Sequence, residues 1–409
     1  MRYPAELRDR HIETCANVLV GIAVVGSAFH FWPGEESKIW QVFNFSNSAV
    51  FIWAIILALM VFKDKKKIVS SMPSICVWGY LVISMLSIAF TKDIGRSVGF
   101  NMKLTAIMVV GYNLICFSGK SMPAIKRIYY FATAAVLVSV GTALVTKYWW
   151  PANGLGFHGN IFKYGTYIGP MAVLCGAYWF DGKGISKKLF AGVLIGGAVL
   201  SSATVGALAS ILAGMMVVTV VIKNTKARLG IIVFVGLAVV LLFLLPAKND
   251  GLSIAKDFKL TEADGGNVRQ RYIEWQAELN LLEKRAGAGT AAGAINDYRS
   301  EFYYRLVKLN TLKAFDLNGW LACGAEIGVV GLMCLGWVFY SYGKKSWGAI
   351  VNGSNEVKRL AGANLAALIT AAVANVFGCL MYNGIIIVFV LILAMIGSVE
   401  KLWRREDEI

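Results

Sequence analysis

The strongest constraint on this chain is a series of apolar runs, each about as long as a helix that crosses a lipid bilayer. Such a helix needs about 20 mostly apolar residues to span a hydrocarbon layer of roughly 30 Å. Twelve runs of this kind occur in the 409 residues, of which 57% are hydrophobic and 16% charged. One soluble core cannot bury so much apolar surface, so the sequence predicts an all-α polytopic membrane protein.

The first predicted span is preceded by Arg2, Arg8 and Arg10 and has no small-residue cleavage site, so we interpret it as an anchor rather than a signal peptide. The predicted spans are residues 14–31, 46–62, 72–90, 99–118, 128–146, 162–180, 189–204, 206–222, 229–246, 321–341, 360–379 and 384–400.

The basic residues of the short loops predict the orientation of these spans, because loops rich in Lys and Arg stay in the cytoplasm. More than half of the 40 Lys and Arg residues lie in alternate loops and at the two ends of the chain. Both termini should therefore be cytoplasmic. The same loops hold most of the excess behind the net charge of +16, so no nucleic-acid partner is expected.

Seven cysteines fall inside or at the ends of the apolar runs, with no close-spaced pair and no neighbouring His. We expect them to be packing residues rather than disulfides or metal ligands. The sequence predicts no metal site and no cofactor.

One long segment, residues 247–320, interrupts the short loops on the predicted extracytoplasmic side, and separates spans 1–9 (residues 1–246) from spans 10–12 (residues 321–409). Apolar residues recur at helical spacing from Val268 to Leu282 and from Ile295 to Leu312, which predicts two amphipathic helices. A glycine-rich stretch, residues 287–293, separates them and favours a tight turn with close backbone approach. We expect a helical cap that packs on the membrane domain.

The span that follows the cap contains Glu326. A carboxylate inside an apolar span is costly, so Glu326 is a functional candidate. Gly324, Gly328 and Gly331 lie beside it and are more simply explained by close helix packing.

These residues resemble a motif of the O-antigen ligase and polymerase superfamily, which reads His-Asn, then Leu three residues after the Asn, then Glu-x-Gly-x-x-Gly. The matching positions are Asn318, Leu321, Glu326, Gly328 and Gly331. The family's His, which is thought to assist the acceptor hydroxyl, falls on Leu317.

Three further stretches are similar to family segments. Residues 271–275 with the following glycines look like an Arg-x-x-x-Trp and glycine-rich segment, and residues 156–160 look like a Gly-and-Asn loop. Residues 200–206 resemble a short loop in which relatives carry Arg, where this chain has Val205. Under the predicted topology all of these segments face one side of the membrane, so they can line one cavity.

The resemblance implies a GT-C-like glycosyltransferase of the bacterial inner membrane. Its donor would be a glycan on undecaprenyl pyrophosphate, and its acceptor a glycan, the lipid A core or a protein. The leaving pyrophosphate needs cations, and the planar fork of Arg suits phosphate oxygens. Arg271 is the leading candidate, and Arg269, Arg299 and Arg305 are alternatives. Solvated helix faces or ion pairs, such as Arg271 with Glu274 or Glu278, are the simpler explanation for most of them.

A general base must accept the proton of the acceptor hydroxyl. Asp316, adjacent to Leu317, is our first choice, and Glu326 is the second. Asn318, Asn160 and His158 are candidate substrate-binding residues, and His158 is preferred to His30 because it lies in the Gly-and-Asn loop.

Two other functions remain open. A transporter or flippase without chemistry would usually show paired broken spans, internal repeats or midplane charges, which this sequence does not clearly have. A non-catalytic family member is the other alternative, because of Leu317 and Val205.

Overall fold

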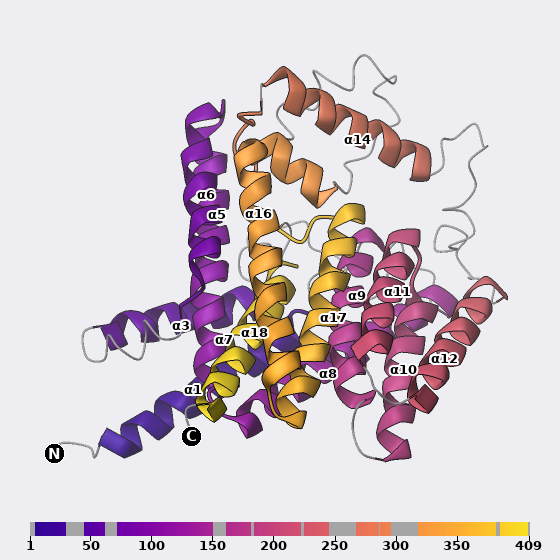
Figure 1. Ribbon diagram of the computed structural model, residues 1–409. Helices are drawn as coiled ribbons and strands as arrows, with labels where there is room; N and C mark the ends of the chain where they lie inside the picture. Colours follow the sequence, from indigo (N-terminus) through magenta and orange to yellow (C-terminus); the bar gives the residue numbers. More distant parts are fainter. Residues whose placement is uncertain are drawn as a thin grey trace.

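The computed structural model describes residues 5–29, 45–61, 72–149, 161–180, 184–221, 225–244, 267–285, 287–295, 318–381 and 385–407, and every regular element in these ranges is a helix (Figure 1). The elements are α1 (Ala5–Gly26), α3 (Phe45–Val61), α5 (Ile75–Leu86), η1 (Ser87–Phe90), α6 (Ile94–Thr105), η2 (Ala106–Gly111), α7 (Tyr112–Ser118), α8 (Met122–Tyr148), α9 (Ile161–Phe180), α10 (Ile185–Ser201), α11 (Val205–Val221), α12 (Thr225–Leu244), α14 (Asn267–Lys284), α16 (Gly319–Asn352), α17 (Asn355–Phe377) and α18 (Ile386–Asp407).

The predicted all-α membrane fold is confirmed. Every predicted span overlaps a helix or, at 99–118, the continuous run from α6 to α7. Within the described residues, five helices are long and apolar enough to cross a membrane: Ile94–Ser118, Met122–Tyr148, Gly319–Asn352, Asn355–Phe377 and Ile386–Glu406. Shorter apolar helices occupy His11–Gly26, Asn47–Leu59, Ile75–Phe90 and Val205–Val221. The number of twelve spans stays a prediction.

The first predicted helix of the long segment is confirmed by α14, whereas the predicted helix beyond residue 295 lies outside the described residues. The predicted apolar face is wrong in one position, because Leu279 is 50% exposed and Leu281 is buried instead. All seven cysteines are free in the structure.

Helices α9, α11 and α17 pack tightly against one another through small residues. A Cβ atom on Gly214 of α11 would overlap Thr370 of α17, and one on Gly169 of α9 would overlap Ser210 of α11. Glycines at such contacts let helix backbones approach closely, which is how helices associate where lipid supplies no hydrophobic driving force. The three helices therefore form one closely packed unit.

The two ends of the helix bundle are formed by different elements. Helix α14 lies at one end, and the start of α1 and the end of α18 lie at the other (Figure 1). Near the end of α18, Glu400 pairs with Lys345 at 2.9 Å and with Arg404 at 2.8 Å. Both ends of the described chain thus share one end of the bundle, as the charge pattern requires. Which side of the membrane this is stays a prediction.

Helix α16 is interrupted at Gly328, whose φ of 83° and ψ of 177° are not helical. A short segment before this glycine and a long one after it meet at an angle (Figure 1). The backbone groups on both sides of such a break lose their helical partners and need others.

Candidate active site

The glycine-rich segment supplies those partners. The N–H groups of Thr290 and Ala291 donate to the Glu326 carbonyl at 3.0 and 2.7 Å, and the Val329 N–H donates to the Gly287 carbonyl at 2.8 Å. A Cβ atom on Gly289 would overlap the Glu326 carbonyl, so only glycine fits there. The predicted close backbone approach is confirmed, and its partner is the break in α16.

The side chain of Glu326 completes this junction. It is 2% exposed, and its Oε1 accepts the N–H of Ile295 at 3.1 Å. On the same segment, the N–H of Ala292 donates to Ser87 Oγ at 3.2 Å. The buried carboxylate therefore anchors the end of the glycine-rich segment, and the hydrogen bond compensates part of the cost of burying it.

Helix α14 packs on α16 beside this junction. Ala277 and Leu281 are buried, and Leu282 lies in van der Waals contact with the Cβ position of Gly324. Arg269 and Arg271 belong to the first turns of α14, but their side chains lie outside the described residues.

The start of α16 is docked on the end of α17. Asn318 is 6% exposed, and its Oδ1 accepts the N–H groups of Trp320 and Leu321 at 3.0 and 3.2 Å, which makes it the N-cap of the helix. The Gly319 N–H donates to the Gly378 carbonyl at 2.9 Å. Asn318 is thus fixed by the fold at the junction of two helices.

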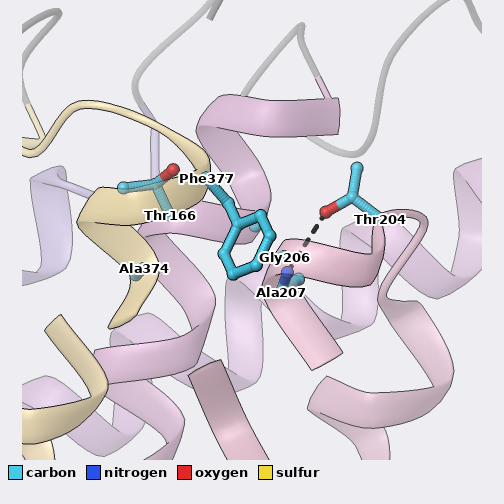
Figure 2. Close-up of a pocket in the computed structure, with 7 residues that line it drawn as sticks. Thr166, Thr204, Gly206, Ala207, Ala374 and Phe377 are labelled. Carbon is cyan, nitrogen blue, oxygen red and sulfur yellow. Dashed lines mark hydrogen bonds between the residues drawn. The ribbon is translucent and has the colours of Figure 1, made fainter. Parts of the chain in front are cut away.

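A small, narrow pocket lies next to this junction; we call it the threonine pocket (Figure 2). Its walls come from the start of α9, the start of α11 and the end of α17, and its lining residues are Gly165, Thr166, Thr204, Gly206, Ala207, Ala374 and Phe377. A Cβ atom on Gly378 would overlap Thr166, which lines the pocket. The carbonyl of Gly378 also accepts the N–H of Gly319, so Gly378 contacts both the pocket and the start of α16.

The turn between α10 and α11 forms one wall of the threonine pocket. Thr204 Oγ1 accepts the N–H of Ala207 at 3.3 Å, shown as a dashed line in Figure 2. Ser201 Oγ is 2.5 Å from the Tyr164 hydroxyl of α9. Val205 is the first residue of α11. The turn is thus held from two helices and borders the pocket.

Lys147, in the last turn of α8, also holds this turn. Its side chain is 2% exposed, and its Nζ donates to the carbonyls of Leu200 at 2.9 Å and Ser202 at 2.6 Å. Lys147 is not among the residues that the sequence predicted for the site. Burial beside a turn more than 50 residues away is a property of the packing, so no local sequence signal identifies it.

Of the predicted site residues, the structure describes the side chains of Asn318 and Glu326 and the backbone of Arg269 and Arg271. The others lie outside the described residues: His158, Asn160, Arg299, Arg305 and Asp316.

A comparison with known protein families finds a match in the middle of the chain. Residues 190–336 match the family model described as O-Antigen ligase, whereas no curated protein matches the chain. The matched segment begins in α10, includes the turn beside the threonine pocket, α14 and the glycine-rich segment, and ends in α16 beyond Glu326 and the break at Gly328. This segment is therefore similar to the O-antigen ligase family, as the sequence motifs predicted.

Proposed function

We propose that this protein is a membrane glycosyltransferase that ligates or polymerises a glycan carried on undecaprenyl pyrophosphate, at the extracytoplasmic face of a bacterial inner membrane. One observation carries the proposal. The start of α11 contacts the end of α17 through Gly206 and Phe377, and the end of α17 binds the start of α16 beside Asn318. The glycine-rich segment binds the same part of α16 at Glu326, so segments from distant parts of the chain meet around α16 and α17. An active site for a large lipid-linked substrate needs such convergence.

In the proposed reaction, the oxygen of an acceptor hydroxyl forms a bond to the anomeric carbon of the donor glycan. The bond from that carbon to the pyrophosphate oxygen breaks, and its electron pair leaves with the lipid pyrophosphate. Asp316 accepts the proton of the hydroxyl, and Arg271 stabilises the negative charge that develops on the leaving group. Arg269, Arg299 and Arg305 are further cations of the same cap.

The other predicted residues take supporting roles. Asn318 uses its side-chain oxygen for the helix cap, so its amide nitrogen is the group that donates to a glycan oxygen. Asn160 and His158 are proposed to bind substrate from the loop before α9. Glu326 remains the alternative base, but its hydrogen bond to Ile295 favours a positioning role.

The test is glycan transfer by purified Arg271→Ala protein in proteoliposomes that contain a lipid-linked donor. We expect transfer to be lost at near-normal protein levels, because a cap arginine adds little to folding but much to pyrophosphate binding. Arg271→Lys should restore only part of the rate, since it lacks the bidentate fork. Wild-type transfer by the Ala variant would remove Arg271 from the site, and donor translocation without transfer by the wild type would favour a flippase.

A further inference from the structure

Helix α6 carries two cations on one exposed face. Arg96 and Lys103 are seven residues apart, which places them two turns apart on the same side of the helix, and both are exposed. Lys103 lies within the apolar run Ile94–Ser118. Among the residues that the structure describes, no carboxylate forms an ion pair with it. A cation inside an apolar span is costly, so its position suggests a function.

Gly99 leaves room between these two cations. It is three residues after Arg96 and four before Lys103, so it lies on the same face. No atom lies within 4 Å of its Cβ position. The two cations are about 10 Å apart along the helix axis, and their long side chains can approach one anion over Gly99 from both ends. We call Arg96, Gly99 and Lys103 the α6 stripe.

The contact between α5 and α6 fixes the direction of the α6 stripe. Ser84 Oγ of α5 donates to Asn101 Oδ1 of α6 at 2.6 Å, and both side chains are buried. At about 100° per residue, Asn101 lies on the opposite side of the helix from the stripe, which therefore faces away from α5. Val98 and Met102, which are 37% and 66% exposed, continue the same outer surface and suit an apolar lipid chain.

The α6 stripe borders the glycine-rich segment that holds the break in α16. A Cβ atom on Gly293 would overlap Phe100, the residue after Gly99. The N–H of Ala292 donates to Ser87 Oγ, in η1, at 3.2 Å. In Figure 1, α6 lies at the edge of the bundle and extends towards the level of α14. A ligand on the stripe would thus lie at the outer edge of the candidate active site, where a substrate carried in the membrane arrives first.

We propose that the α6 stripe is the docking site at which the pyrophosphate of the lipid-linked donor first binds, with its polyprenyl chain along Val98 and Met102. Charge complementarity favours this occupant, because two adjacent cations match the several negative charges of a pyrophosphate better than the single charge of a phosphatidylglycerol headgroup. The inference rests on the proposed function. It adds a donor-binding surface outside residues 190–336, the segment that matches the family model.

A lysine that only extends its ammonium group to the membrane surface is the competing explanation for Lys103. Such a lysine would add no affinity for pyrophosphate. The acid next to the stripe, Asp93, caps α6, since its Oδ1 accepts the N–H of Arg96 at 3.0 Å. Two residues elsewhere offer matched controls. Lys187 is an exposed lysine on α10, and Gly141 is an exposed glycine on α8 with no atom within 4 Å of its Cβ position.

The experiment measures binding of radiolabelled undecaprenyl pyrophosphate to purified protein in phosphatidylcholine nanodiscs. We expect Lys103→Met and Arg96→Met each to weaken binding about 5- to 20-fold, between the effect of an exposed ion pair and that of a lost hydrogen bond to a charged group. Gly99→Leu keeps both charges but fills the space between them, and should weaken binding to a similar extent. The controls Lys187→Met and Gly141→Leu should remain within about threefold of wild type. All five positions are exposed, and leucine and methionine favour helices, so we expect every variant to fold, which gel filtration checks. If one stripe variant is misfolded, the other two decide.

A second measurement identifies the occupant. Unlabelled undecaprenyl pyrophosphate should displace the probe fully, whereas phosphatidylglycerol added to the nanodiscs should displace it only weakly. In transfer assays, Lys103→Met should raise the KM for the donor and leave kcat within about threefold of wild type, because a docking site acts before the reaction.

Wild-type affinity in all three stripe variants would overturn the inference. Equal displacement by phosphatidylglycerol would also overturn it, because the stripe would then be a site for ordinary anionic lipids. A lower kcat with unchanged KM in Lys103→Met would contradict a role in docking. The proposed function fails separately: if the wild-type protein binds the probe through the stripe but transfers no glycan, the docking site stands and the glycosyltransferase activity does not.

Discussion

At the scale of single residues, Glu326 illustrates how a fold can change the meaning of a motif position. The sequence presents it as a carboxylate inside an apolar span, which suggests chemistry. The structure places it on the N–H of Ile295, at the end of the segment that fills the break in α16. Anchoring of that segment is thus a structural role for Glu326, and its role as the alternative base stays a prediction.

Glutamine at position 326 separates these two roles, because its amide oxygen can accept the Ile295 N–H but cannot accept a proton from the substrate. We expect Glu326→Gln to transfer glycan within about threefold of the wild-type rate. Glu326→Ala leaves a buried N–H without a partner and should cost about 1–3 kcal/mol of stability. Transfer rates and thermal unfolding of both variants provide the check. Loss of transfer in a fully stable Glu326→Gln protein would instead make Glu326 the base.

Asp316 carries the complementary prediction. If it is the general base in place of the absent family His, Asp316→Asn should lower the transfer rate by about 10²- to 10⁴-fold, and lipid-linked donor should accumulate. Leu317→His in the Asp316→Asn background should restore part of the rate. Transfer at the wild-type rate by Asp316→Asn would contradict this assignment.

At the scale of secondary-structure elements, the break in α16 is the feature that hydropathy could not predict. Residues 319–352 form one apolar stretch, and hydropathy follows composition rather than backbone geometry. The break is stabilised by hydrogen bonds from residues 287–291, which lie between α14 and α16 in the sequence. By contrast, the apolar runs and the periodicity of α14 were sufficient to predict their helices, because these signals are local. The pocket and the burial of Lys147 could not be predicted from the sequence, because they depend on which distant helices pack together.

Two glycines of α16 test the break directly. Gly328 has a positive φ and a Cβ atom there would overlap the Gly287 carbonyl, whereas Gly336 has no atom within 4 Å of its Cβ position. Gly328→Ala should therefore destabilise the protein by more than about 2 kcal/mol, through strain and steric overlap. Gly336→Ala should be neutral or stabilising by up to about 1 kcal/mol. Thermal unfolding of the two variants in the same detergent gives the comparison, and equal melting temperatures would contradict the account of the break.

At the scale of the whole molecule, the topology links the fold to the proposed function. The described ends of α1 and α18 lie at the end of the bundle opposite α14, and the charge pattern predicts that end to be cytoplasmic (Figure 1). In a protein without native cysteines, Ser253→Cys should therefore react with an impermeant maleimide added outside. The exposed control Asn352→Cys should react only after permeabilisation. The reverse pattern would place the site in the cytoplasm and exclude the shared extracytoplasmic cavity.

The central claim is that this protein forms a glycosidic bond to the acceptor and breaks the bond between the donor glycan and its lipid pyrophosphate. The direct measurement uses wild-type protein in proteoliposomes, with a glycan on undecaprenyl pyrophosphate as donor and a second lipid-linked glycan or lipid A core as acceptor. The account predicts one molecule of free undecaprenyl pyrophosphate for each new glycosidic bond. Movement of intact donor across the bilayer, with no lipid pyrophosphate released in the presence of either acceptor, would contradict it.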